Sequence, residues 1–344
     1  MTTLAVGTVK GAFLLRSHRD DGWGVEGPVF PGWEVTAFGR AEDGTVLAGV
    51  ASGWFGPAVH RSPDLATWEQ VADGPAWPEG TGRKLNKIWF FHRDDATLWC
   101  GVDDAGIFRS DDHGVSWQSV PGLNEHPTRP GWSPGAGGMC AHHMMTDGDR
   151  VWVGISAVGV MRSDDGGATF TRRDEGIVSL AGPEDESFDG SCVHGLVADP
   201  ADPSRIWRQD HSGVYRTEDG GDTWQTIEDG LPAAFGFPIA RDDASGALFV
   251  VPLAADVNRL PVDGRFCAYR STNGGDSWHQ AGSGWPEGPT FTSVLRRAMC
   301  TDGRGGVYLG TTGGSVWASH DVGDNWYEVP ARFPRIATVA VLDG

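Results

Sequence analysis

Short apolar stretches alternate with turn residues along the whole chain. Stretches of four residues such as LWCG (98–101), VWVG (151–154) and VYLG (307–310) are too short for helices, and Gly, Asp or Asn residues follow them closely. After most of these turns comes a second apolar stretch that ends in arginine, as in GIFR at residues 106–109. Many short apolar runs separated by turn signals are typical of an all-β protein.

A motif of the form Ser/Thr-x-Asp-x-Gly-x-x-Trp follows these arginines. Five good copies begin at Ser110, Ser163, Thr217, Ser271 and Ser319, and weaker copies begin at residues 17 and 62. The aromatic residues that close the seven copies lie roughly fifty residues apart. They are Trp23, Trp68, Trp117, Phe170, Trp224, Trp278 and Trp326.

A repeat of this length predicts one four-stranded blade of a β-propeller per copy. The N-terminal segment offers only three strands, and the apolar run at 335–342 offers the missing one. Pairing of this last run with the first strand would close the ring and leave no open sheet edge. The sequence therefore predicts an all-β fold, a single seven-bladed propeller that uses residues 1–344 as one domain.

The acidic residue of the motif has a structural explanation. Its carboxylate can accept backbone N–H groups within its own turn, the glycine permits a positive φ, and the tryptophan anchors the hairpin in the core. Asn273 replaces the aspartate in one copy and keeps the acceptor without the charge. We therefore interpret the motif as a folding device and not as a catalytic or metal site.

The motif resembles the Asp-box, or bacterial neuraminidase repeat. This repeat is shared by sialidases, glycosidases of plant polysaccharides, sortilin-type receptors and photosystem assembly factors. The resemblance covers the full chain and is strongest to sialidase-like and glycosyl-hydrolase-like proteins with a single propeller. It implies the propeller fold, which carries many different functions.

The sialidase reaction itself is not expected. Sialidases carry a Phe/Tyr-Arg-Ile-Pro motif near the N-terminus, whereas the nearest string here is FPRI at residues 333–336. They also use a tyrosine nucleophile, and all four tyrosines of this chain fall in predicted strands beside a repeat, at Tyr215, Tyr269, Tyr308 and Tyr327. If the protein is an enzyme, the sequence favours another hydrolase or a lyase.

Charge and cysteine content narrow the choice of partners and compartment. The formal net charge is −19, which opposes binding to nucleic acids and to anionic membranes. Five scattered cysteines do not indicate a disulfide framework, and the N-terminus does not resemble a signal peptide. The expectation is a cytoplasmic protein with neither a nucleic-acid nor a membrane partner.

A binding site is expected where long loops meet the central channel. The long loops are 72–83, 121–138, 177–190 and a segment with Asp256, Asn258 and Arg259. Counting back from the aspartates that end the channel-lining strands aligns the candidates of each blade. The count gives one residue at an equivalent position in each of six strands: Lys87, His142, His194, Phe237, Arg297 and Thr338. Cys140 and Cys192 lie two residues before the two histidines.

Two kinds of site are compatible with these residues. His142, His194 and His211, with or without a cysteine, could bind a divalent transition metal or act as acid–base groups; the alternative is that they are buried packing residues. Lys87, Arg296 and Arg297 could instead form a basic pocket for a small carboxylate or another anion; here the alternative is a set of internal salt bridges. Asp210 completes the catalytic candidates, and the remaining ligand-binding candidates are Trp54, Asn86, Trp132, His143 and Gln209.

The function that the sequence favours is binding or turnover of a small molecule at the channel mouth. One alternative is a glycoside hydrolase with a saccharide ligand, which needs a carboxyl pair about 5–5.5 Å or 6.5–9.5 Å apart. The candidates for such a pair are Glu34, Glu125, Asp189 and Asp210. The other alternative is a non-catalytic scaffold or assembly factor, which a flat face without a deep pocket would favour.

Overall fold

The structure is a computed structural model of the 344-residue chain, in which residues 2–18, 22–135, 137–178, 191–254 and 257–343 are described. Regular structure in these residues is almost entirely β. The helical segments are α1 (Pro121–Asn124) and the 3₁₀ turns η1 (Arg129–Gly131) and η2 (Val262–Gly264). No helix in the described part of the chain has the length and apolar character needed to cross a membrane.

Five of the sheets have four strands each. The first contains β4 (Glu34–Arg40), β5 (Val46–Ser52), β6 (Gly56–Ser62) and β7 (Glu69–Gln70). The second contains β8 (Lys87–Asp94), β9 (Thr97–Asp103), β10 (Gly106–Ser110) and β11 (Gln118–Ser119). The third contains β12 (Ala141–Asp147), β13 (Arg150–Ile155), β14 (Gly159–Ser163) and β15 (Thr171–Arg172). The fourth contains β16 (Val193–Asp199), β17 (Asp202–Asp210), β18 (Val214–Thr217) and β19 (Gln225–Thr226). The fifth contains β20 (Gly236–Arg241), β21 (Leu248–Pro252), β22 (Tyr269–Ser271) and β23 (His279–Gln280).

The remaining strands form one eight-stranded sheet in the order β27-β26-β25-β24-β28-β1-β2-β3. Its strands are β1 (Thr3–Thr8), β2 (Gly11–His18), β3 (Gly22–Val29), β24 (Val294–Thr301), β25 (Val307–Thr311), β26 (Val316–Ser319), β27 (Tyr327–Glu328) and β28 (Ile336–Val341). The C-terminal strand β28 pairs antiparallel with β1, and a single parallel bridge between Arg297 and Thr338 joins it to β24. The two ends of the chain therefore share one sheet.

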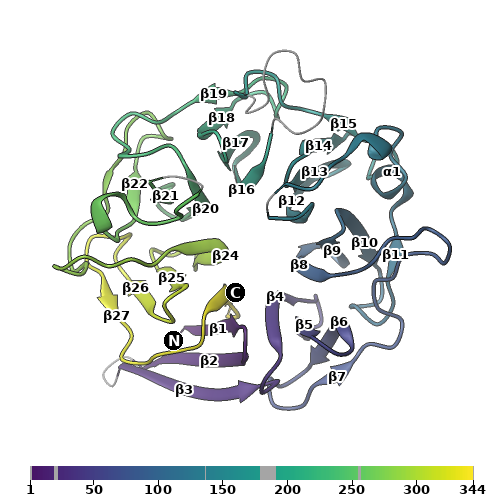
Figure 1. Ribbon diagram of the computed structural model, residues 1–344, viewed down its shortest axis with the longest axis horizontal. Helices are drawn as coiled ribbons and strands as arrows, with labels where there is room; N and C mark the ends of the chain where they lie inside the picture. The colour runs from purple at the N-terminus through teal and green to yellow at the C-terminus, as the bar shows by residue number, and fades with distance from the viewer. Residues whose placement is uncertain (1, 19–21, 136, 179–190, 255–256, 344) are drawn as a thin grey trace.

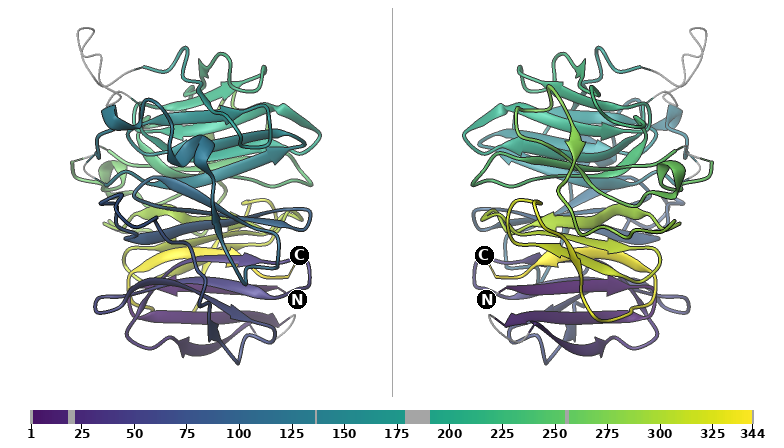
Figure 2. Two further views of the ribbon diagram at one scale, coloured as in Figure 1. Left: turned by 90° about the vertical axis from the view of Figure 1, so that its right-hand side faces the viewer. Right: turned by 90° about the vertical axis from the view of Figure 1, so that its left-hand side faces the viewer.

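The sheets are arranged radially around a common axis (Figure 1). The strands nearest the axis are β4, β8, β12, β16, β20, β24 and β28, and short strands such as β7, β15 and β27 lie at the rim. Seen from the side, the sheets stack into a short cylinder (Figure 2). This arrangement is a β-propeller.

The inner strands share an irregularity that shapes the channel. In β4, β8, β12 and β16 the pairing with the next strand skips one residue, at Thr36, Trp89, His142 and His194 respectively. Such a bulge leaves its residue unpaired and turns its side chain away from the regular alternation. The four bulged residues occupy equivalent positions near the N-terminal ends of their strands.

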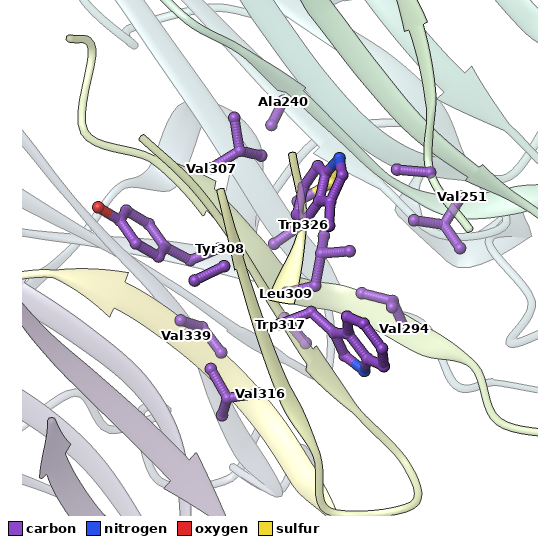
Figure 3. Packing of buried hydrophobic residues seen from close by; sticks show 14 of the residues in the cluster. Ala240, Val251, Val294, Val307, Tyr308, Leu309, Val316, Trp317, Trp326 and Val339 are labelled. Atoms are coloured by element: carbon purple, nitrogen blue, oxygen red, sulfur yellow. The ribbon is translucent and has the colours of Figure 1, made fainter. Parts of the chain in front are cut away.

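Apolar side chains fill the space between neighbouring sheets. In the largest cluster, Trp317 and Trp326 pack with Leu309 against Val251 and Ala240 of the adjacent sheet (Figure 3). All of these side chains are at least nine-tenths buried. Each sheet buries both of its faces against the neighbouring sheets. Polar groups therefore lie at the outer rim of the propeller, on its two flat ends and in the channel.

The repeated acidic motif forms the turn between the third and fourth strands of a sheet. In the β18–β19 turn, the Asp219 carboxylate accepts hydrogen bonds from Thr217 Oγ1 (2.6 Å) and Thr223 N (2.9 Å). Burial acts to raise the pKa of Asp219, but these hydrogen bonds outweigh it and lower the pKa to about 2. In the turn with asparagine, Asn273 Oδ1 accepts from Ser277 N at 3.1 Å. The turn thus needs an acceptor at this position, as the sequence predicts.

We expect Asp219→Ala to destabilise the protein by about 1–2 kcal/mol, since several hydrogen bonds to a charged acceptor are lost. Asp219→Asn keeps the acceptor oxygen and is expected to cost less than about 1 kcal/mol. Urea unfolding curves of the two variants and the wild type measure the difference. Equal losses in both variants would show that the charge, and not the acceptor, stabilises the turn.

Candidate functional site

Two adjacent cavities lie at the N-terminal ends of the inner strands. The larger has a volume of about 210 Å³ and the smaller about 150 Å³. The larger is lined by Val9, Glu34, Thr36, Lys87, Trp89, Gly137, Phe237, Arg259, Leu295, Arg296, Arg335, Ile336 and Ala337. The smaller is lined by Gly135, Gly137, Gly138, Ser156, Ala157, Cys192, His194, His211, Phe235, Phe237, Arg259 and Arg296. Four residues belong to both, so Arg296 and Arg259 stand between the two cavities.

Arg296 reaches this position because β24 is irregular. Its pairing with β25 breaks between Val294 and Met299, a wider interruption than in the other inner strands. The Arg296 guanidinium lies over Phe237, with Cζ 4.9 Å from the ring centroid, and 6.0 Å from the centroid of Trp89. Burial lowers the pKa of Arg296, but an arginine side chain remains protonated at neutral pH.

The larger cavity is basic although the protein is acidic. Its charged lining residues are Glu34, Lys87, Arg259, Arg296 and Arg335, four cations against one anion. Lys87 and Glu34 neutralise each other through an ion pair at 3.0 Å. Arg296 and Arg335 form no ion pair with a described carboxylate, so they leave this cavity with positive charge.

Several polar atoms of the site are buried without a hydrogen-bond partner among the described residues. They include Arg296 Nε, Trp89 Nε1 and His142 Nε2. No carboxylate in the described part of the chain forms an ion pair with Arg296. Buried donors that lack a protein acceptor usually bond to water or a ligand. At this site the unsatisfied donors of Arg296 and Trp89 favour an acceptor, and the positive charge favours an anion.

The histidines predicted from the sequence divide into two groups. His194 and His211 lie with Cys192, and the ligand atoms of these three residues are all within 4.8 Å of one another. His142 instead contacts His143, with their Nδ1 atoms 2.9 Å apart, and packs edge-on against Trp89. The predicted set of His142, His194 and His211 is therefore not a single cluster, and Cys192 takes the place expected for His142.

Burial and positive neighbours keep His142, His143 and His194 neutral. The pKa of His142 is held well below its usual range by burial, then by His143 and Arg296. The pKa of His194 is lowered by burial and by Arg296, and that of His143 by burial and by Arg297 and Arg296. A neutral imidazole can accept a proton or bind a metal through its free nitrogen.

Strand counting misplaced two basic residues. Lys87 pairs with Asp103 two residues before the bulge at Trp89, so Trp89, and not Lys87, is the structural equivalent of His142. Arg297 lines neither cavity: its backbone bridges to Thr338 of β28, and its charge acts on His143 and His92 of the inner strands β12 and β8. Trp89 lies five residues before Asp94, as His142 lies five before Asp147, so a count from Asp94 gives Trp89. In the irregular strand β24, Arg296 is the arginine that reaches the cavities.

Asp210 and Gln209, expected to take part in catalysis and ligand binding, are structural. Asp210 is fully buried and forms an ion pair with Arg208. Gln209 Nε2 donates to the carbonyl oxygens of Asp210 (3.0 Å), Gly213 and Ala234. Both side chains hold the turn that carries His211, which lines the smaller cavity.

The two predicted tryptophans have different environments. Trp132 is buried, stacks on His126 and donates through Nε1 to Thr128 Oγ1 at 3.0 Å, so it fixes its loop and is not available to a ligand. Trp54 is 93% exposed, and with Phe55 and Asn86 it borders an open hollow that shares no lining residue with the two cavities. A ligand that contacts Trp54 and Asn86 would thus bind in this hollow and not in either of the two cavities.

The carboxylates proposed for glycoside hydrolysis do not form a pair. Glu34 lines the larger cavity and is bound to Lys87, Glu125 is exposed beside α1, and Asp210 is paired with Arg208. Asp189 and the loop residue Asp256 lie outside the described residues. Among the described candidates, only Glu34 reaches the channel.

Sequence reasoning missed two residues that line the larger cavity. Trp89 follows Lys87 by two positions and lies five residues before Asp94, the same distance that separates His142 from Asp147, so a count from Asp94 would have found it. Arg335 immediately precedes β28 and lines the larger cavity. Its position at the start of the predicted closing strand could have indicated that it lies at the channel mouth.

No known family description and no curated protein matches the sequence. Solved structures do match. YCF48 from Cyanidioschyzon merolae is similar over 87% of this chain and 85% of its own, with 12% identity and a TM-score of 0.56. YCF48 bound to the D1 peptide is similar over 88% and 85%, with 13% identity and a TM-score of 0.55. An ancestral GH74 enzyme has 16% identity and a TM-score of 0.56 over 84% of this chain but only 37% of its own.

All three are β-propeller proteins. The chain shares their fold. At 12–16% identity the likeness concerns the fold alone, and this chain spans well under half the length of the GH74 protein. The propeller neighbours include both an enzyme and a peptide-bound protein, so the function must be argued from the cavities of this chain.

Proposed function

We propose that the protein binds a small anionic ligand, such as a carboxylate, in the larger cavity at the channel mouth. The observation that carries the proposal is the buried Arg296 guanidinium, which has no carboxylate partner among the described residues. A buried guanidinium is costly without a partner, and a bound carboxylate would supply both the charge and the acceptors. Phe237 and Trp89 provide apolar walls for the rest of the ligand.

The experiment is a thermal-shift and calorimetric titration of the metal-free protein with succinate, citrate, benzoate and inorganic phosphate. At least one of these anions is expected to raise the Tm and to bind with a measurable Kd. Removing one buried charge-assisted contact costs about 1.5–3 kcal/mol, so Arg296→Gln is expected to weaken that binding by tenfold or more. The control variant Arg304→Gln removes an exposed arginine outside both cavities and is expected to bind as the wild type does. Binding that is unchanged in Arg296→Gln, or a wild type that none of the four anions binds, would contradict the proposal.

We also infer that the ring has seven blades of the Asp-box type. The eight-stranded sheet is joined at its middle only by the single parallel bridge between Arg297 and Thr338, so it divides naturally into β24–β27 and β28 with β1–β3. These two groups and the five four-stranded sheets make seven units. In this count the N- and C-terminal segments complete one blade together, and the channel is lined by one strand from each unit.

Glycoside hydrolysis is less well supported than anion binding. The reaction needs two carboxyl groups about the scissile bond, and Glu34 is committed to Lys87 at 3.0 Å. Arg296 and Arg335 of the larger cavity also favour a negative ligand over a neutral sugar.

A scaffold function has support from a different surface. Trp54 and Phe55 are 93% and 84% exposed and border an open hollow of about 620 Å³ with Lys84, Leu85 and Asn86. Exposed aromatic pairs of this kind are enriched where proteins bind partners, and one propeller neighbour is a protein bound to a peptide. If this surface binds a protein, Trp54→Ser should abolish that complex and leave the binding of small anions unchanged.

A further inference from the structure

Cys192, His194 and His211 form a compact group at the edge of the smaller cavity. Their sulfur and nitrogen ligand atoms all lie within 4.8 Å of one another, from two neighbouring segments of the same sheet. Thiolate and imidazole are the ligand types that Zn²⁺ and related divalent metals prefer.

The backbone brings the three side chains together. Cys192 and His194 are two residues apart at the start of β16, where the bulge at His194 interrupts the pairing with β17. His211 follows β17, and its backbone N–H donates to the Cys192 carbonyl oxygen at 3.0 Å. The returning turn is therefore fixed directly beside the cysteine.

The neighbouring sheet has the same backbone arrangement without the third ligand. There the N–H of Ser156 donates to the Cys140 carbonyl oxygen at 2.9 Å, so Ser156 stands where His211 stands in the next sheet. Cys140 and His142 are the equivalents of Cys192 and His194, but Cys140 Sγ is directed to the Gly137 carbonyl oxygen. Among the described residues, the sheet of Cys192 thus has all three ligands, and the neighbouring sheet has the cysteine and one histidine but not the third ligand.

The orientation of His194 suits a ligand. Its Nδ1–H donates to the Gly236 carbonyl oxygen at 2.6 Å, which fixes the tautomer and leaves Nε2 with a free lone pair. Metal-binding histidines are commonly held by a second hydrogen bond of this kind. Burial and the Arg296 cation hold the pKa of His194 well below its usual range, so the ring is neutral at pH 7.

We propose that Cys192, His194 and His211 bind a single divalent transition metal, with Zn²⁺ as the expected ion. Bond lengths of about 2.3 Å to sulfur and 2.0 Å to nitrogen place tetrahedral ligand atoms about 3.3–3.6 Å apart, so movements of about 1 Å close the site. Three protein ligands leave a fourth position open. That position can take water or an anionic oxygen, and Arg296 lines the same cavity as the three ligands.

The cysteine must lose its proton on binding. Burial raises the pKa of the Cys192 thiol, and the neighbouring Arg296 acts in the opposite direction. A metal replaces that proton directly, so metal binding releases one proton per site and weakens as the pH falls.

The test is a titration of the metal-free, untagged protein with Co²⁺ under reducing conditions. We expect one equivalent to bind, with a thiolate-to-cobalt charge-transfer absorption and the strong visible bands of a tetrahedral ion, and Zn²⁺ to displace it. Cys192→Ser is expected to lose the charge-transfer absorption and to weaken binding at least hundredfold, and His211→Gln to weaken it at least tenfold. Cys140→Ser, the matched control in the neighbouring sheet, and His142→Gln are expected to retain both the absorption and the stoichiometry.

Absence of the thiolate absorption in the wild type would overturn the proposal, and this result needs no variant. Retention of the absorption in Cys192→Ser would also overturn it, as would its loss in Cys140→Ser with circular dichroism unchanged. The metal and anion proposals fail separately: His211 does not line the larger cavity, so His211→Gln is expected to weaken cobalt binding and to leave the binding of small anions unchanged.

Discussion

Replacing Arg208 by leucine is expected to destabilise the protein by about 3–5 kcal/mol. The Arg208 side chain is completely buried between Asp174, whose Oδ1 lies 2.5 Å from Nη1, and Asp210, which is also completely buried. Burial acts to raise the pKa of Asp174, but Arg208 and Arg172 outweigh it and the pKa is lowered. Removal of Arg208 leaves two buried carboxylates with much of their charge uncompensated, which is costly in a medium of low polarity.

Arg205 on the same strand provides the matched control. It pairs with Glu218 at 2.9 Å, but both side chains are exposed to solvent by 41% and 51%. Exposed pairs contribute about 0–1 kcal/mol, so Arg205→Leu is expected to cost less than about 1 kcal/mol. Urea unfolding curves measure both variants. Similar losses in the two variants would contradict the account of the buried pair, which also fixes the turn that presents His211 to the smaller cavity.

A large loss of stability is also expected between pH 6.5 and pH 4.5. The pKa of His92 is lowered to about 4 by burial and by Arg297, and those of His142, His143 and His194 are lowered well below their usual range. In the unfolded chain these groups titrate near 6.5. Below that pH the unfolded state binds more protons than the folded state, so the stability is fully present above pH 6.5 and is lost as the pH falls.

Each such histidine contributes a slope of about 1.4 kcal/mol per pH unit below its unfolded pKa. The four together predict a loss of several kcal/mol in the free energy of unfolding between pH 7.5 and pH 5, measured on metal-free protein. His92→Gln is expected to reduce the slope by about one quarter, whereas His279→Gln at an exposed position is expected to leave it unchanged. A free energy of unfolding that stays constant from pH 7.5 to pH 5 would show that the histidines are protonated in the folded state.

The fold was accessible from the sequence because its repeated turn is a local structure. The Asp219 turn is closed by residues within six positions, from Thr217 to Thr223, so its pattern is readable without knowledge of distant contacts. The predicted four-stranded units follow from this pattern. The pairing of β28 with β1 was also predicted, since the N-terminal segment lacked one strand.

The site was only partly accessible because it depends on irregularities and on distant segments. Trp89, and not Lys87, corresponds to His142 because it lies five residues before the aspartate that ends β8. The wider bulge in β24 presents Arg296 to the cavities. Two Cys-x-His sequences are equivalent in the chain, but only Cys192 has a histidine opposite it. That difference arises because the turn after β17 places His211 beside Cys192. Counting residues along one strand cannot predict a contact between two strands.

The most direct test of the channel-mouth anion site is an anomalous-diffraction map of crystals grown without metal and soaked in bromide. The account predicts a bromide peak in the larger cavity beside the Arg296 guanidinium, in contact with the edge of Phe237 or Trp89, and its absence in Arg296→Gln crystals. A map in which bromide occupies only the outer rim and the exposed faces, with the wild-type cavity free of anomalous signal, would contradict the central claim.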